Sequence, residues 1–256
     1  MQYGLRQKEG GAVTPILWNQ LDSKSDETVE AFLLHSRRFK ETSLIVEFLT
    51  LERGRLTVIS KGALREKSRI GPSLQPFTRL QLECKGKSEL LNLIKAEPLE
   101  YFPRINGIRL YSSLYANELL IKLTVPDDPV PEVYAIYQQL LRKLAAETSL
   151  EQTLRYFELS VLNAIGLGPI LDRVIDTGKL IEASKKYHFV AGNGVFETKR
   201  ATTGIELTGN TLIKLSSGQN LDHQRLNEAK HLLRYVINYH LEGRELKSRK
   251  LFYRKH

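Results

Sequence analysis

The hydrophobic periodicity of the chain changes near Pro103, and this change constrains the fold more than any other feature. Before it, short β-forming runs alternate with turn signals such as Gly54 and Gly86. The runs cover residues 31–35, 43–50, 56–60, 78–84 and 90–96. Five short strands in about 70 residues favour a small closed or partly closed barrel of the OB-fold type. An SH3-like barrel or a small sandwich fits the same pattern.

After Pro103, apolar residues recur at i, i+3, i+4 and i+7, which predicts amphipathic helices. The helical stretches start near residues 108, 133, 150, 210 and 222, and Ser149 and Gly166 suit the start and the end of the third. Residues 172–209 are instead rich in glycine, and Asn193-Gly194 predicts a β-hairpin. We therefore expect an α+β fold: an N-terminal OB-fold β-barrel, then a mainly α-helical bundle domain with a small inserted β-hairpin lobe.

These patterns divide the chain into three parts. Residues 1–28 are polar, lack the features of a secretory signal and are expected to be a poorly ordered extension. Residues 29–103 form the expected barrel, and residues 104–256 the helical domain with its lobe at about 170–209. No apolar run approaches the roughly 20 residues that span a bilayer, so we expect no membrane partner and a cytoplasmic protein.

The charge balance favours a polyanionic partner. Lys and Arg number 38 against 29 Asp and Glu, a net charge of +9, which points to nucleic acid first and to an anionic membrane surface second. The single cysteine, Cys84, excludes an intrachain disulfide and a cysteine zinc site. There is no phosphate-binding Gly-Lys-Ser/Thr loop and no convergent cluster of His, Asp or Cys. We therefore expect that the protein is not an enzyme and that it binds no cofactor or metal.

A basic loop among the predicted strands is the strongest candidate for binding. Six cations fall within 17 residues: Arg53, Arg55, Lys61, Arg65, Lys67 and Arg69. Small barrels bind single strands with such cations and with aromatic platforms, for which Phe39 and Phe77 are candidates. Gly62 and Gly71 would let the backbone approach a partner closely. A solvated turn that binds nothing is the alternative.

Taken in order, several segments resemble the RecO family of bacterial recombination and repair mediators. The matching segments are Ala31-Phe32-Leu33-Leu34-His35, Lys61-Gly62-Ala63, Gln75-Pro76-Phe77, Asn117-Glu118-Leu119-Leu120, Arg155-Tyr156-Phe157 and Leu246-Lys247-Ser248-Arg249. The resemblance implies an OB-fold, binding of single- and double-stranded DNA and annealing of complementary strands. It also implies action with RecR in loading RecA on strands coated with single-stranded DNA-binding protein (SSB), close to the nucleoid.

The resemblance further implies that the acidic C-terminal tail of SSB docks on the helical domain. Arg155, Phe157 and Leu159 match that position, although Arg155 would also suit an ordinary surface helix. Many family members bind zinc through four cysteines in the third lobe, whereas residues 170–200 contain none, so we expect no zinc. The basic C-terminal stretch, residues 246–252, is expected either to dock on the helical bundle or to contact phosphate. An RNA- or ribosome-associated binding module remains the alternative function.

Overall fold

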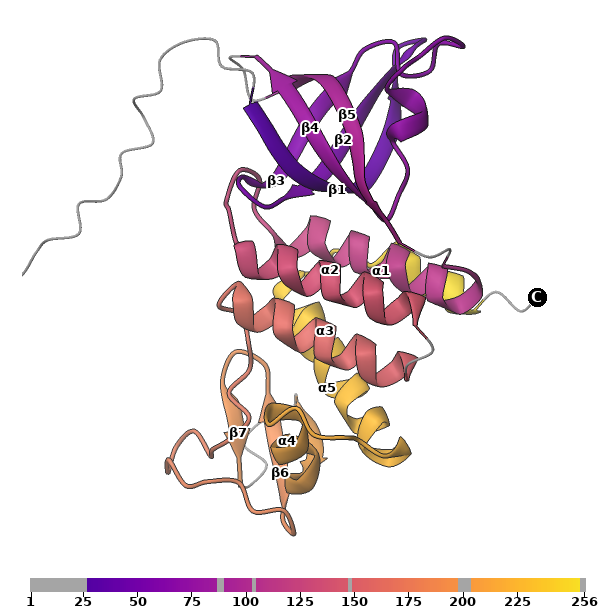
Figure 1. Cartoon of the computed structure of the whole chain (residues 1–256). Coiled ribbons are helices and arrows are strands. Elements are labelled where there is room, and N and C mark those ends of the chain that lie inside the picture. The colour runs from indigo at the N-terminus through magenta and orange to yellow at the C-terminus, as the bar shows by residue number, and fades with distance from the viewer. Residues whose placement is uncertain (1–26, 87–89, 103–104, 147–148, 198–203, 254–256) are drawn as a thin grey trace, which may run out of the picture.

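The computed structural model describes residues 27–86, 90–102, 105–146, 149–197 and 204–253. Three parts follow one another along the long axis of the molecule (Figure 1): a β-barrel, a layer of helices, and a small lobe. The barrel and the lobe lie at opposite ends, and the helices separate them. The predicted extension at residues 1–28 lies almost entirely outside the described residues.

The barrel contains five strands, as predicted. They are β1 (Glu27–Phe39), β2 (Ser43–Thr50), β3 (Gly54–Ser60), β4 (Thr78–Lys85) and β5 (Leu91–Tyr101). The closed order β1-β2-β3-β5-β4, with β3 and β5 parallel, is the OB type of barrel and confirms the predicted fold class. The first strand is much longer than residues 31–35, because an irregularity between Leu33 and His35 lets it bend and pair with both β2 and β4.

Alternate residues of the strands fill the barrel. Val29, Ala31 and Leu33 point inward from β1, and Leu80 and Leu82 from β4, all buried. Phe48 of β2 belongs to the same core. Their neighbours Phe32, Leu34 and Leu49 point outward but are equally buried, because they pack against the helices. Two-sided burial explains why the runs look more continuously apolar than a half-exposed strand would.

The helical layer contains four long helices: α1 (Gly107–Leu123), α2 (Pro131–Ala145), α3 (Leu150–Ala164) and α5 (His223–His240). A 3-10 segment, η3 (Lys247–Tyr253), follows α5 and packs against α1. Ser149 does occupy the N-cap position of α3, but its side chain makes no capping hydrogen bond. Gly166, at a φ of 74°, follows the end of α3, as predicted.

The lobe is a three-stranded sheet in the order β7-β6-β8, followed by the short helix α4 (Gly209–Ser216). Its strands are β6 (Lys186–Val190), β7 (Gly194–Phe196) and β8 (Ile205–Thr208). The predicted hairpin is confirmed: Val190 pairs with Gly194, and Gly194 has a φ of 113°. The buried side chains of the lobe, including Tyr187 and Phe189, continue the helical core, so packing holds the lobe.

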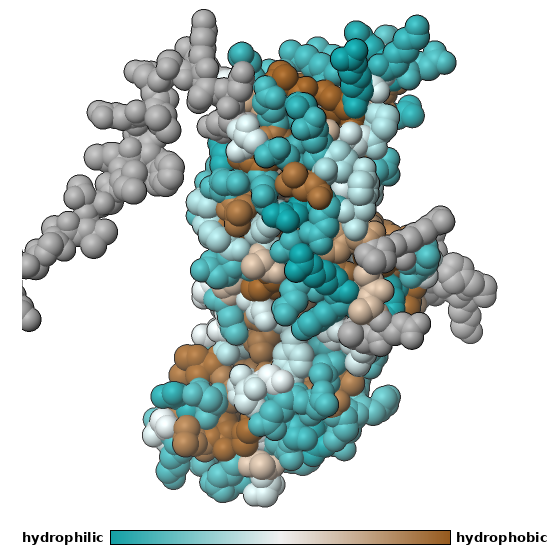
Figure 2. Space-filling model, viewed as in Figure 1, coloured by the Kyte–Doolittle hydropathy of each residue, from teal (hydrophilic) through white to brown (hydrophobic). Residues whose placement is uncertain are grey.

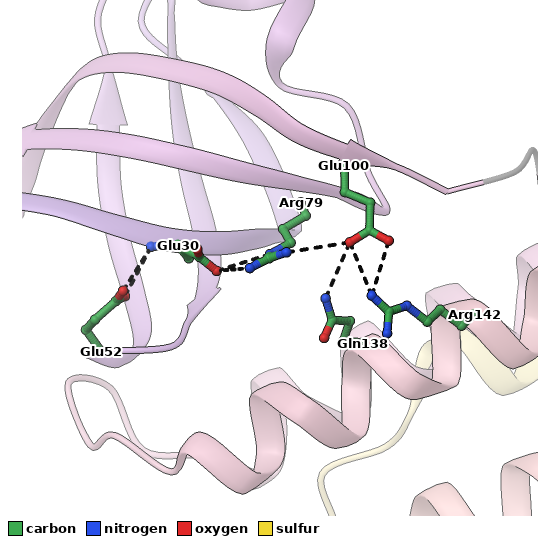
Figure 3. Close-up of polar contacts among 6 residues, drawn as sticks. All are labelled: Glu30, Glu52, Arg79, Glu100, Gln138 and Arg142. Atoms are coloured by element: carbon green, nitrogen blue, oxygen red, sulfur yellow. Dashed lines mark hydrogen bonds and ion pairs between the residues drawn. The ribbon is translucent and has the colours of Figure 1, made fainter.

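Polar contacts attach the barrel to the helices. Asn117 of α1 donates from Nδ2 to the carbonyl of Leu34 at 2.9 Å, and its Oδ1 accepts from the Tyr137 hydroxyl at 2.6 Å. At the edge of this interface, Glu100 of β5 accepts hydrogen bonds from Gln138 and Arg142 of α2 (Figure 3). Both contacts join elements of different parts, which places the barrel in a defined position on α1 and α2.

Candidate functional site

The end of the barrel that faces away from the helices carries a cationic surface, which we call the barrel tip (residues 37–42 and 61–69). The β1–β2 hairpin and the start of the β3–β4 connection meet there, because Leu44 pairs with Ser60 and Leu64 N–H donates to the Thr42 carbonyl at 2.9 Å. Four of the predicted cations lie on it and are exposed: Lys61, Arg65, Lys67 and Arg69. Figure 2 shows mostly hydrophilic residues over this end of the barrel.

The β3–β4 connection is a structured series of turns. Arg65 N–H donates to the Gly62 carbonyl, and Gly71 N–H donates to the Ser68 hydroxyl at 3.0 Å. Buried Ala63 and half-buried Ile70 hold the connection against the barrel. A Cβ on Gly71 would lie 2.3 Å from the carbonyl oxygen of Ala63. Close packing within the loop is therefore enough to require glycine at position 71, which the sequence had linked to the approach of a partner.

The tip also contains cations that sequence reasoning missed. Arg37 and Arg38, at the end of β1, and Lys40, in the hairpin turn, are exposed. The Lys40 ammonium lies 5.5 Å from the ring centre of half-buried Phe39, so a predicted aromatic residue does lie among the cations. Seven cations therefore share the described tip with two carboxylates. They were missed because the hairpin that brings residues 37–40 beside residue 61 is a tertiary contact.

Three of the predicted DNA-binding residues do not lie at the tip. Arg53 forms an ion pair with Asp127 at 2.5 Å, and Arg55 pairs with Glu47 at 3.0 Å. Phe77 packs against the helical core. Arg53 and Arg55 therefore do not form one loop with the other four cations, because β3 carries the chain about 20 Å, six steps of about 3.3 Å, from one end of the barrel to the other.

The helical layer contains a pocket of about 300 Å³ between α1, α3, α5 and η3. Apolar side chains form part of its wall: Ile108, Leu150, Leu154 and Phe252. Four cations also line it, and they outnumber the carboxylates of Glu151 and Glu158: Arg155, Lys230, Arg234 and Arg249. A pocket with this lining suits a ligand that combines an apolar group with negative charge.

Arg155 lies in the pocket wall and is 8% exposed. Its guanidinium contacts Glu158 Oε1 at 2.6 Å, and the same oxygen accepts from the Tyr115 hydroxyl at 2.8 Å. Burial, and then the charge of Glu158, raise the pKa of Tyr115, so this hydroxyl stays protonated and remains a donor. Arg155 Nε is buried and has no acceptor within the described part of the chain, which leaves one guanidinium donor open.

The structure corrects the other two residues of this predicted site. Phe157 and Leu159 are 4% and 7% exposed, belong to the helical core and do not line the pocket. Phe157, two positions from Arg155, points to the opposite side of the helix; Leu159, four positions away, is near the Arg155 face but is buried in the helical core. The sequence also missed Lys230 and Arg234, whose spacing of four places them on one face of α5. Arg249 comes from the basic C-terminal stretch.

Two further observations concern metal binding and membrane insertion. Among the described residues, no three His, Cys, Asp or Glu side chains are grouped so that they could hold a metal ion. In the same part of the chain, no helix is both long and apolar enough to cross a membrane.

Comparison with known proteins agrees with both halves of the architecture. Residues 25–102 match the family model "Recombination protein O N terminal", and residues 104–250 match "Recombination protein O C terminal". A protein of Methylococcus capsulatus named DNA repair protein RecO is 40% identical over 222 residues, which are 87% of this chain and 91% of that protein. Proteins of the same name from Hamiltonella defensa and Aliivibrio fischeri are 38% and 34% identical, over 87% and 86% of this chain and 95% and 93% of their own lengths. The chain belongs to the RecO family of DNA repair proteins.

Proposed function

We propose that this protein acts in DNA repair as a mediator that binds and anneals DNA strands without consuming nucleotide. The barrel tip binds the phosphate backbone of single- and double-stranded DNA, and the pocket receives the acidic tail of SSB. With RecR, the protein then helps RecA to load on SSB-coated strands in the cytoplasm. The observation that carries the DNA-binding part is the convergence of seven exposed cations beside Phe39 at one end of an OB-type barrel.

The physical reasons are general ones. Cations that neutralise phosphates release counterions, so binding is strong at low salt and independent of sequence. A half-buried aromatic ring offers a surface on which one base can stack. Neutralised strands repel one another less, which favours annealing. Arg53, Arg55 and Phe77 are not part of this proposed surface, because their side chains contact residues of the chain itself.

The test compares two double charge reversals on the full chain. Lys61→Glu with Arg65→Glu changes the tip, whereas Lys179→Glu with Lys186→Glu changes the lobe at the opposite end of the molecule by the same net charge (Figure 1). We expect the tip variant to bind a labelled single strand more weakly and to flatten the slope of log affinity against log salt by about 1.4, for two lost phosphate contacts.

The lobe variant should keep both the affinity and the slope, and both proteins should be tested for acceleration of annealing between complementary strands. Equal losses in the two variants would mean that general charge, and not the tip, determines binding. Tighter binding of a matched RNA strand than of DNA would favour an RNA-binding module instead.

A further inference from the structure

The C-terminal segment η3 is attached to α1 largely by one carboxylate. Glu118 Oε1 accepts the backbone N–H of Lys247 at 2.8 Å, and Oε2 accepts the backbone N–H and the hydroxyl of Ser248 at 2.7 Å and 2.5 Å. One turn further along α1, Lys122 Nζ donates to the carbonyl of Glu245 at 2.7 Å. Two of the sequence segments that resemble the family, one on α1 and one at the C-terminus, are therefore in direct contact.

These contacts require Glu118 to be charged. Partial burial raises the pKa of Glu118. The hydrogen bonds from Ser248 and Lys247 together lower this pKa by more than burial raises it, so it lies below its ordinary value. At neutral pH the carboxylate is ionised and accepts three donors. Hydrogen bonds to a charged group are the stronger kind, which makes this attachment sensitive to the loss of a single charge.

The segment that Glu118 holds supplies one wall of the pocket. Arg249 directly follows Ser248, and Phe252 lies one turn later; both line the pocket. The Phe252 ring meets Tyr111 of α1 edge-on at 6.3 Å, and Arg249 donates to Asn238 Oδ1 at 2.7 Å. Glu118 itself does not line the pocket, so any effect it has on a ligand there acts through η3.

We propose that Glu118 is a positioning residue of the pocket: by anchoring Lys247 and Ser248, it holds Arg249 and Phe252 where they select a peptide that ends in an apolar residue with a free carboxylate. This inference rests on the proposed function of the pocket as a peptide site. A guanidinium recognises the terminal carboxylate, and the phenyl ring packs against the last side chain.

The test measures binding of a fluorescent acidic peptide that ends in phenylalanine with a free carboxylate, and of its C-terminal amide, to the full chain. We expect the native chain to prefer the carboxylate form. Glu118→Gln should weaken binding of the carboxylate form by about fivefold to tenfold and that of the amide form by less than about twofold. The substitution makes the protein more positive, so general attraction to an acidic peptide would instead strengthen binding.

Glu245→Gln is the matched control, because it makes the same charge change two residues before η3 at a side chain that is 76% exposed. Its ion pair with Lys250 of η3, at 3.5 Å, joins two exposed side chains and contributes little to holding the segment. This variant should bind both peptides as the native chain does. Hydrogen exchange at the amides of Lys247 and Ser248 should accelerate in Glu118→Gln and not in the control. Ser248→Ala removes only the hydroxyl donor and should show a smaller loss of the same kind, and it decides the question if Glu118→Gln does not fold.

The outcomes separate the two proposals. A native chain that binds neither peptide, or both equally, overturns the peptide function of the pocket together with this inference. A native chain that prefers the carboxylate form, with Glu118→Gln retaining both that affinity and that preference, overturns the inference alone.

Discussion

Replacing Asn117 should weaken the junction between the barrel and the helices more than any exposed ion pair at that junction. Asn117 is 3% exposed, and its side-chain amide joins the Leu34 carbonyl of β1 to the Tyr137 hydroxyl of α2. Tyr137 is fully buried, and burial raises its pKa, so the hydroxyl remains a proton donor. Asn117→Leu keeps the volume approximately but leaves both partners without a hydrogen bond.

The magnitude follows from these two partners. A buried polar group left unsatisfied costs about 1–3 kcal/mol, so Asn117→Leu should lower the free energy of unfolding by about 2–6 kcal/mol. Tyr137→Phe removes one donor and leaves only Asn117 Oδ1 unsatisfied, which should cost about 1–3 kcal/mol. In the double variant the hydroxyl and Asn117 Oδ1 are both absent, so only the Leu34 carbonyl stays unsatisfied and the cost is again about 1–3 kcal/mol. The sum of the two single effects should therefore exceed the effect of the double variant by about 2–6 kcal/mol.

Urea unfolding of the native chain, both single variants and the double variant measures this coupling. Circular dichroism near 222 nm follows the helices, and the slope against urea shows whether barrel and helices still unfold together. A coupling below about 0.5 kcal/mol would refute the reasoning, because it would mean that the amide and the hydroxyl act independently. A loss below about 1 kcal/mol for Asn117→Leu would show that water satisfies the Leu34 carbonyl and the Tyr137 hydroxyl.

Two further predictions concern the tip and the lobe. In Gly71→Ala, the new Cβ meets the Ala63 carbonyl oxygen, so the β3–β4 connection must shift. The affinity for single-stranded DNA, measured by fluorescence anisotropy, should fall several-fold. An unchanged affinity would exclude this loop from the DNA interface. Glu228 of α5 accepts hydrogen bonds from Thr208 and Thr211. Burial raises the pKa of Glu228, but its hydrogen bonds lower that pKa by more, so it lies below the ordinary value of 4.5. Because its folded-state pKa is depressed, its contribution to stability is present above about pH 4.5 and is lost as pH falls through the folded value. Glu228→Gln should therefore lower the melting temperature at pH 7 and differ less from the native chain near pH 3; an equal difference at both pH values would contradict this.

Sequence reasoning reached the architecture because local patterns carry it. The alternation in residues 78–84, the helical stripes after Pro103 and the Asn193-Gly194 turn each depend on neighbours within a few positions. It also identified the cations of residues 61–69 and the pocket residue Arg155. It failed where proximity in sequence differs from proximity in space, as for Arg53 and Arg55 at the opposite end of β3.

The family segments illustrate the same limit. Asn117 and Glu118 are adjacent in sequence, yet one contacts the barrel and the other the C-terminal segment, because successive residues of a helix point about 100° apart. Neither contact is visible without the tertiary structure.

The sequence by itself determined the order of the elements, the basic character of the protein and its lack of a cysteine zinc site, since these follow from composition and local periodicity. Only the tertiary structure decided which cations lie together. The closed barrel brings residues 37–40 beside residues 61–69, and the docking of η3 on α1 brings Arg249 beside Arg155 across nearly a hundred residues. Electrostatic and hydrogen-bonding interactions depend on distance in space, and the chain determines that distance only after its apolar faces have packed.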